Sequence, residues 1–189
     1  MIKKSMLWLL LLGFMCLTGC PKKYSSTDAA LPAGVNPGET YYTQFSLFQE
    51  KNNFRTTNYR RGGLIPINTP VSLVSMDSSD IVVKLRDSGQ ELNIENVQKH
   101  TNEDIQQAFK KILDKRKVDL SQFSKEEQQN ILAGQVAKGM RRKAVLAAIG
   151  YPPGNSTPTL ETSEWMYWNN RFDRFIVRFK GDVVEQIVN

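Results

Sequence analysis

The pattern of apolar and polar positions divides the chain into segments of different character. Residues 6–15 form an almost unbroken apolar run that follows two lysines near the start. Residues 20–40 are polar, rich in Ser, Ala, Pro and Gly, and without an apolar period, which is typical of a flexible tether. From residue 41 onward, apolar positions recur with periods that predict strands first and then helices.

Residues 41–97 have the pattern of a small all-β unit. Apolar and β-branched residues dominate at 71–76 and 81–85, and Leu92 and Ile94 share one face of a further predicted strand. Asp, Ser and Gly clusters separate these runs, while Pro66 and Pro70 predict an edge strand or loop. We therefore expect about four to six short strands that form an SH3-like β-barrel over residues 41–100.

Residues 101–117 have the periodicity of an amphipathic helix. Thr101 is the expected N-cap, with Asp104 as the third helical residue. The C-terminal half is rich in Lys and Arg, which suits the helix dipole and predicts a solvated face. We assign residues 101–123 to a linking helix. Its apolar stripe comprises Ile105, Ala108, Phe109, Ile112 and Leu113.

Residues 124–189 predict two further helices and then three strands. Ser124 and Glu127 form a capping box that begins the first helix, which Gly139 is expected to end. The second helix covers residues 141–149 and has Gly150 as its C-cap. The strands are expected at 164–168, 174–179 and 183–188, with turns at 169–171 and 180–182. The whole fold is therefore α+β.

The start of the chain reads as an export signal. Two lysines precede an apolar stretch of about ten residues, the length of a secretory signal rather than of a membrane span. The segment Leu17-Thr18-Gly19-Cys20 that follows resembles the bacterial lipobox. It implies removal of residues 1–19 and lipidation of Cys20, which would anchor the chain to a membrane. The alternative is an ordinary secretory signal with a chance cysteine.

Export changes what the charge means. The chain has 25 basic and 19 acidic residues, a formal net charge of +6, and loss of two lysines with residues 1–19 leaves +4. An exported protein argues against nucleic acid as the partner despite this basic balance. The residues directly after Cys20 are Pro21 and Lys22 and include no aspartate, which favours the outer membrane, facing the periplasm, over the inner membrane.

Few residues are available for chemistry. The chain has two cysteines and one histidine, His100, too few for a Cys/His zinc site or a disulfide framework. A catalytic base needs a positioned nucleophile and an orienting acid, and nothing near His100 shows such a set, so we interpret it as a surface or capping residue. We expect a protein that is not an enzyme and carries no metal or cofactor other than the lipid on Cys20.

The C-terminal segment resembles the SmpA/OmlA (BamE-like) lipoprotein family. The resemblance rests on Gly139-Met140, Ile149-Gly150-Tyr151-Pro152-Pro153, the aromatic run 165–168, and residues 175–187. It implies two helices packed on a three-stranded antiparallel sheet. It also implies a role with the outer-membrane β-barrel assembly machinery and contact with phosphatidylglycerol. The chain departs from the family in having arginines directly after Gly139-Met140, and in the β-rich segment that precedes.

Two groups of residues are candidates for binding. Residues 138–180 contain eight basic and three acidic residues, and three of the cations begin a helix, where the dipole disfavours them. We predict contact with an anionic partner, such as lipid headgroups, lipopolysaccharide phosphates or an acidic protein; a solubilising surface is the alternative. The aromatic cluster is expected to place one strand face in the core and one against a partner. The basic candidates are Arg141, Arg142, Lys143, Arg174 and Arg178, and the aromatic candidates are Trp165, Tyr167 and Trp168.

These observations favour a non-enzymatic, membrane-anchored scaffold or accessory factor in the assembly of outer-membrane or envelope proteins. A second class is a module that binds cell-wall material or peptides through the barrel, for which Tyr41, Phe54 and Tyr59 are the candidate aromatic residues. A third class is an inhibitor of a periplasmic enzyme.

Overall fold

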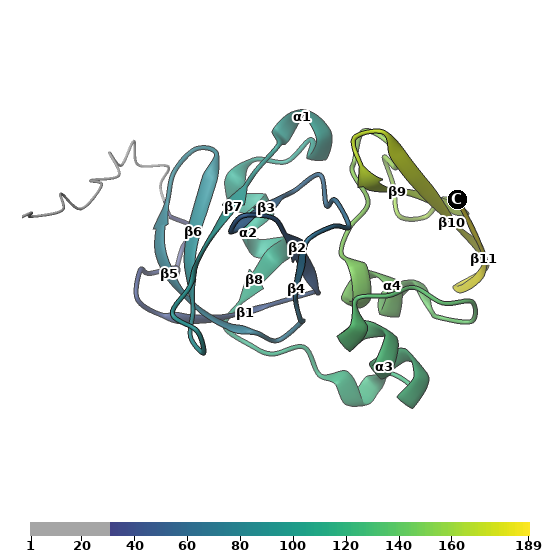
Figure 1. Cartoon of the computed structure of the whole chain (residues 1–189), viewed down its shortest axis with the longest axis horizontal. Coiled ribbons are helices and arrows are strands. Elements are labelled where there is room, and N and C mark those ends of the chain that lie inside the picture. Colours follow the sequence, from purple (N-terminus) through teal and green to yellow (C-terminus); the bar gives the residue numbers. More distant parts are fainter. Residues whose placement is uncertain (1–30) are drawn as a thin grey trace, which may run out of the picture.

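The computed structural model describes residues 31–189. The predicted signal segment, Cys20 and residues 20–30 of the predicted tether lie outside the described residues. Within them the fold is α+β, with a curled six-stranded half-barrel, four helices and a C-terminal three-stranded antiparallel sheet. In Figure 1 the half-barrel lies on the left, and the C-terminal sheet lies on the right above α3 and α4.

The half-barrel has the strand order β3-β7-β6-β5-β1-β8, in which only the β3–β7 pair is parallel. A separate antiparallel pair, β2–β4, completes this unit. The register shifts in β5 around Val74, which is 42% exposed. The strands are β1 (Thr40–Thr43), β2 (Leu47–Gln49), β3 (Asn53–Arg55), β4 (Gly63–Ile65), β5 (Pro70–Met76), β6 (Asp80–Leu85), β7 (Glu91–Glu95) and β8 (Leu113–Asp114).

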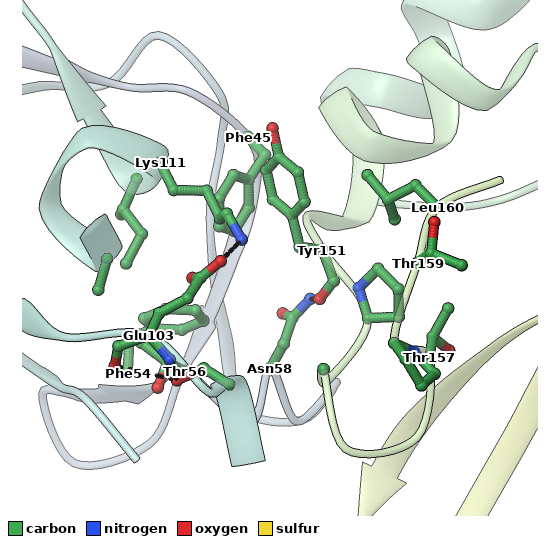
Figure 2. Close-up of a pocket in the computed structure, with 16 residues that line it drawn as sticks. Phe45, Phe54, Thr56, Asn58, Glu103, Lys111, Tyr151, Thr157, Thr159 and Leu160 are labelled. Carbon is green, nitrogen blue, oxygen red and sulfur yellow. Dashed lines mark hydrogen bonds and ion pairs between the residues drawn. The ribbon is translucent and has the colours of Figure 1, made fainter. Parts of the chain in front are cut away.

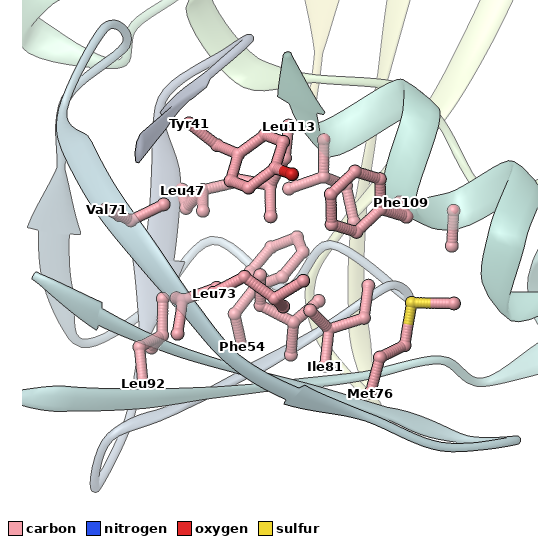
Figure 3. Close-up of a cluster of buried hydrophobic side chains, with 14 of the residues drawn as sticks. Tyr41, Leu47, Phe54, Val71, Leu73, Met76, Ile81, Leu92, Phe109 and Leu113 are labelled. Carbon is pink, nitrogen blue, oxygen red and sulfur yellow. The ribbon is translucent and has the colours of Figure 1, made fainter. Parts of the chain in front are cut away.

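The alternating strand residues fill the inside of the half-barrel, as the sequence predicts (Figure 3). Leu92 and Ile94 are fully buried on one face of β7. The ring of Tyr41 meets Phe109 edge-on, with a centroid distance of 5.3 Å and an interplanar angle of 83°. One detail differs from the expectation. Pro70 lies in neither a loop nor an edge strand: it is the first residue of β5, which pairs with both β1 and β6.

The predicted linking helix is shorter than expected. Residues 98–101 form a separate turn of helix, α1 (Gln98–Thr101), and α2 covers only Ile105–Ile112. Asp104 rather than Thr101 is the N-cap of α2, because its carboxylate accepts the N–H of Gln107 while Gln107 bonds back to Asp104. The helix ends where Leu113 becomes extended and β8 pairs with β1. The predicted apolar stripe is confirmed, and its side chains pack into the half-barrel core.

The C-terminal unit follows the expected order of elements. A short 3-10 turn, η1 (Leu120–Gln122), precedes α3 (Lys125–Ala133) and α4 (Arg142–Ile149); the strands are β9 (Glu164–Asn170), β10 (Asp173–Lys180) and β11 (Val183–Val188), in the order β11-β10-β9. The Ser124–Glu127 capping box and the Gly150 C-cap are present. Two boundaries differ. α3 ends at Gly134, which has the left-handed conformation, and not at Gly139; Asn170 still belongs to β9, so the first turn is Arg171–Phe172.

Buried polar contacts join the half-barrel to the C-terminal unit. The Ser46 hydroxyl donates to the Ile131 carbonyl at 2.9 Å and accepts the Ile67 N–H at 3.0 Å. The Arg60 guanidinium donates to the Gly134 carbonyl, and burial lowers the pKa of Arg60 to about 10. Because such groups are costly when left unpaired, these contacts fix the two units against each other.

Candidate functional site

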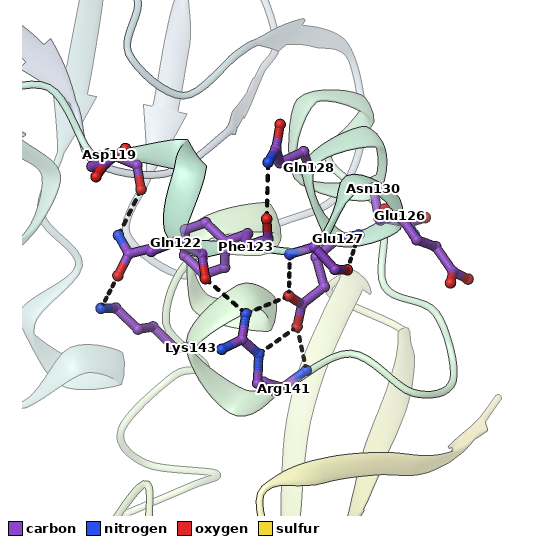
Figure 4. Close-up of polar contacts among 10 residues, drawn as sticks. Asp119, Gln122, Phe123, Glu126, Glu127, Gln128, Asn130, Arg141 and Lys143 are labelled. Carbon is purple, nitrogen blue, oxygen red and sulfur yellow. Dashed lines mark hydrogen bonds and ion pairs between the residues drawn. The ribbon is translucent and has the colours of Figure 1, made fainter.

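The side chain of Arg141, the first of the predicted contact residues, forms hydrogen bonds with other groups of the same chain (Figure 4). It is the N-cap of α4, and its side chain donates to both carboxylate oxygens of Glu127, Nε at 3.0 Å and Nη2 at 2.6 Å. Its backbone N–H also donates to Glu127 at 3.0 Å, and Nη2 reaches the Gln122 carbonyl. Glu127 is 5% exposed. The Glu127 carboxylate thus binds both the side chain and the backbone N–H of the N-cap residue of α4.

Arg142 is also directed at the protein itself. Its guanidinium donates to the carbonyls of Leu160 (2.6 Å), Thr162 (2.8 Å) and Gly181 (3.1 Å). It also lies over the Phe179 ring, 4.2 Å from the centroid. These contacts tie α4 to the loop before β9 and to the β10–β11 turn. Internal acceptors hold part of each guanidinium, and contact of Arg141 and Arg142 with an anionic partner stays a prediction.

The remaining basic candidates are more exposed. Lys143 donates to the side chain of Gln122. Arg178 forms an ion pair with Glu164 at 2.7 Å, across the β9–β10 pair. Arg174 lies on the same face of β10 as Arg178, and its guanidinium stands over the Trp168 ring at 4.6 Å. Of these cations, Arg174 has an aromatic ring rather than a carboxylate or an amide as its main neighbour.

The aromatic candidates divide between core and surface. Trp165 and Tyr167 are 1% and 0% exposed and lie beneath α4. Each has its polar atom satisfied, since Trp165 Nε1 donates to the Leu160 carbonyl at 3.1 Å and the Tyr167 hydroxyl to the Gly150 carbonyl at 2.9 Å. The prediction of a partner surface is therefore wrong for these two residues. They form the core face that the alternation also predicts.

Trp168 lies on the opposite face and is partly covered by the half-barrel unit. His100 stacks on it with a centroid distance of 6.0 Å, and Tyr59 lies at 6.2 Å on a tilted ring plane. Burial lowers the pKa of His100, and the positive charges of Lys99 and Arg55 lower it further. Residues far apart in the sequence thus meet at one place, which no local pattern could show.

The β9–β10 hairpin ends in an exposed phenylalanine. Phe172 is 81% exposed, the most exposed of the large apolar side chains in residues 31–189. The Arg171 guanidinium lies over its ring at 4.3 Å. The adjacent Asp173 accepts a hydrogen bond from Asn169 at 2.9 Å. We call Trp168, Arg171, Phe172 and Arg174 the hairpin surface.

The hairpin surface combines ring faces with positive charge. Within the described part of the chain, neither Arg171 nor Arg174 forms an ion pair with a carboxylate. A surface of this kind suits a partner that offers both anionic groups and apolar contact. The sequence pattern does not single out Arg171 and Phe172, because they fall in a predicted turn and beside it. The available signal was a large apolar residue among polar turn residues.

Two further properties concern residues 31–189 as a whole. No group of three or more His, Cys, Asp or Glu side chains lies close enough there to hold a metal ion. None of the helices in this range is long and apolar enough to cross a bilayer. Comparison of the chain with protein-family models, curated proteins and solved structures gave no match.

Proposed function

We propose that the chain is a lipid-anchored scaffold or accessory factor, without enzymatic activity, that acts in outer-membrane protein assembly from the periplasmic side. In this proposal Cys20 carries the lipid, the half-barrel is of SH3-like type, and the C-terminal unit is of the SmpA/OmlA (BamE-like) type. The lipobox-like segment and the order of two helices and three strands support it.

The hairpin surface is the observation that carries the proposal. An apolar ring that is 81% exposed gains free energy when a partner covers it, and aromatic and Arg residues are enriched where binding energy concentrates. Arg171 and Arg174 are held by ring contacts, so they lose little freedom on binding and keep their charge for the partner. We infer an acidic face on a subunit of the assembly machinery as the partner.

The attachment of the hairpin to a fixed body supports a scaffolding role. Tyr59 and His100 of the half-barrel unit pack against Trp168, which lies near the turn of the hairpin, so both units hold the hairpin close to its tip. A partner bound at the tip would therefore be held at a set orientation relative to the whole body.

Photocross-linking in cells tests the proposal. The lipidated full-length chain would carry a photoreactive benzoylphenylalanine at Phe172 or, as the control, at Leu132 on α3, which is 48% exposed. We expect cross-links to a β-barrel assembly subunit from position 172 only. Cross-links to lipid alone, or the same products from both positions, would contradict the proposal.

A charge-reversal pair makes the test sharper. Arg171→Glu with Arg174→Glu should abolish the cross-link, because both variants place negative charge against an acidic face. Lys125→Glu changes an exposed cation at the start of α3 and should leave the cross-link intact.

A further inference from the structure

A cavity of about 160 Å³ lies at the junction of the half-barrel, α2 and the loop that follows α4 (Figure 2). It is separate from the hairpin surface. Aromatic rings and prolines supply the apolar part of its lining, and an amide, an ion pair and several threonines supply the polar part. The residues that matter for its chemistry are Phe45, Phe54, Asn58, Glu103, Lys111 and Tyr151.

Asn58 offers an unused hydrogen-bond acceptor in this cavity. The residue is 2% exposed, and its Nδ2 donates to the carbonyls of Ile149 at 2.5 Å and Tyr151 at 3.0 Å. These two bonds fix the amide in the wall of the cavity (Figure 2), where Oδ1 is buried and has no partner among the described residues. A buried acceptor in this position is complementary to a ligand N–H or O–H group.

Lys111 supplies a donor on another wall. Its ammonium group is paired with the Glu103 carboxylate and lies 4.3 Å from the centroid of the Tyr151 ring. An ammonium group has three N–H donors, and Glu103 takes up one of them. A ligand amide between the two side chains would therefore donate its N–H to Asn58 and accept at its carbonyl from Lys111.

The volume of the cavity and the aromatic rings that line it indicate the apolar part of the ligand. A cavity of roughly 150 Å³ holds a benzene-sized group. Phe45 meets both Phe54 and Tyr151 edge-on, with centroid distances of 6.3 and 6.1 Å, and these three rings line the space next to the amide. The apolar part of a ligand would pack against them.

We propose that this junction cavity binds a carboxamide carried on an apolar group, either in a peptide segment or in a free small amide. The ligand N–H donates to Asn58 Oδ1, its carbonyl accepts from Lys111 Nζ, and its apolar part packs against Phe45, Phe54 and Tyr151. The inference is independent of the proposed scaffold function, since it rests on a different site.

NMR titration of the full-length ¹⁵N-labelled chain in a mild detergent tests the proposal with three probes. Benzamide presents the ring, the donor and the acceptor; N,N-dimethylbenzamide lacks the N–H donor; benzene lacks the amide. We expect benzamide to shift the side-chain amide signals of Asn58 and to bind at least tenfold more tightly than the other two. Equal binding of benzamide and either control, or no shift at Asn58, would overturn the proposal.

A cavity-filling variant locates the binding, and a fourth probe identifies the source. Ala108→Met, from a buried residue of the lining, should abolish the benzamide shifts, whereas Ala133→Met at an exposed helix position should not. Benzamide shifts that persist in a folded Ala108→Met chain would count against the site. Should that variant not fold, the probe comparison in the wild type still decides. Tighter binding of N-acetylphenylalanine methylamide than of benzamide would assign a peptide source, and the reverse order a free small amide.

Discussion

The buried carboxylate of Glu127 should make the stability of the fold depend on pH. Hydrogen bonds from the Arg141 side chain are the main cause that lowers the pKa of Glu127 from 4.5 to about 2, and the backbone N–H groups of Arg141 and Ser124 act in the same direction against the effect of burial. A carboxyl whose pKa is lower in the folded chain stabilises it above pH 4.5. That contribution is lost as the pH falls toward 2.

The size of the effect follows from the shift. A pKa drop from 4.5 to about 2 corresponds to about 3 kcal/mol of unfolding free energy. The Arg141 side chain is 44% exposed, so solvent screens part of this interaction, and we expect about 2 kcal/mol. Glu127→Gln should therefore lower the unfolding free energy by about 2 kcal/mol at pH 7. The difference from the wild type should shrink toward zero at pH 2.

Urea unfolding of residues 31–189, followed by tryptophan fluorescence between pH 2 and 7, measures this difference. Glu126→Gln is the matched control, because it removes the same charge one residue earlier from an exposed position. It should change stability by less than about 0.5 kcal/mol at every pH. A Glu127→Gln deficit that stays constant down to pH 2 would refute the reasoning, because the loss would then come from shape and not from the ionised carboxylate.

Three other substitutions, one of them with a matched control, test contacts that hold the fold together. Gly150→Ala should lower the unfolding free energy by about 3 kcal/mol, because φ is +71° and the added Cβ would lie 2.4 Å from the Phe45 ring. Gly181→Ala is the control: φ is +63° but the space is open, so the loss should be only about 1 kcal/mol. Thermal unfolding measures both. Ser46→Ala should cost about 1–3 kcal/mol by urea unfolding, since it leaves the buried Ile67 N–H unpaired and removes one of the two hydrogen bonds to the Ile131 carbonyl. Arg142→Lys should cost about 1 kcal/mol and speed amide hydrogen exchange in residues 160–163, because an ammonium cannot reach all three carbonyls.

Local signals predicted most of the fold. The Ser124 capping box, the Gly150 C-cap and the alternation in β9–β11 depend on residues a few positions apart, and the structure confirms them. The errors lie where a distant segment decides. The helix predicted to reach residue 117 ends at Ile112, because Leu113 pairs with Thr43 as part of a strand.

The candidate site was harder to predict, because charge in a sequence does not show which groups surround it. The alternation along β9 puts Trp168 on the face opposite Trp165, yet its neighbours Tyr59 and His100 come from another unit. The cavity was not predicted at all. Asn58 belongs to a segment without periodicity, and its importance follows only from the two carbonyls that hold its side chain.

The arginines after Met140 show why a local argument does not locate a partner. Cations at the start of a helix are unfavourable, and this cost predicts a nearby anion. The anion exists, but it is Glu127 of the preceding helix, and Arg142 finds three backbone carbonyls instead. Once these internal partners are counted, Arg171 and Arg174 beside the exposed Phe172 have no carboxylate among residues 31–189. These contacts favour the tip of the β9–β10 hairpin over the start of α4 as the surface that binds a partner.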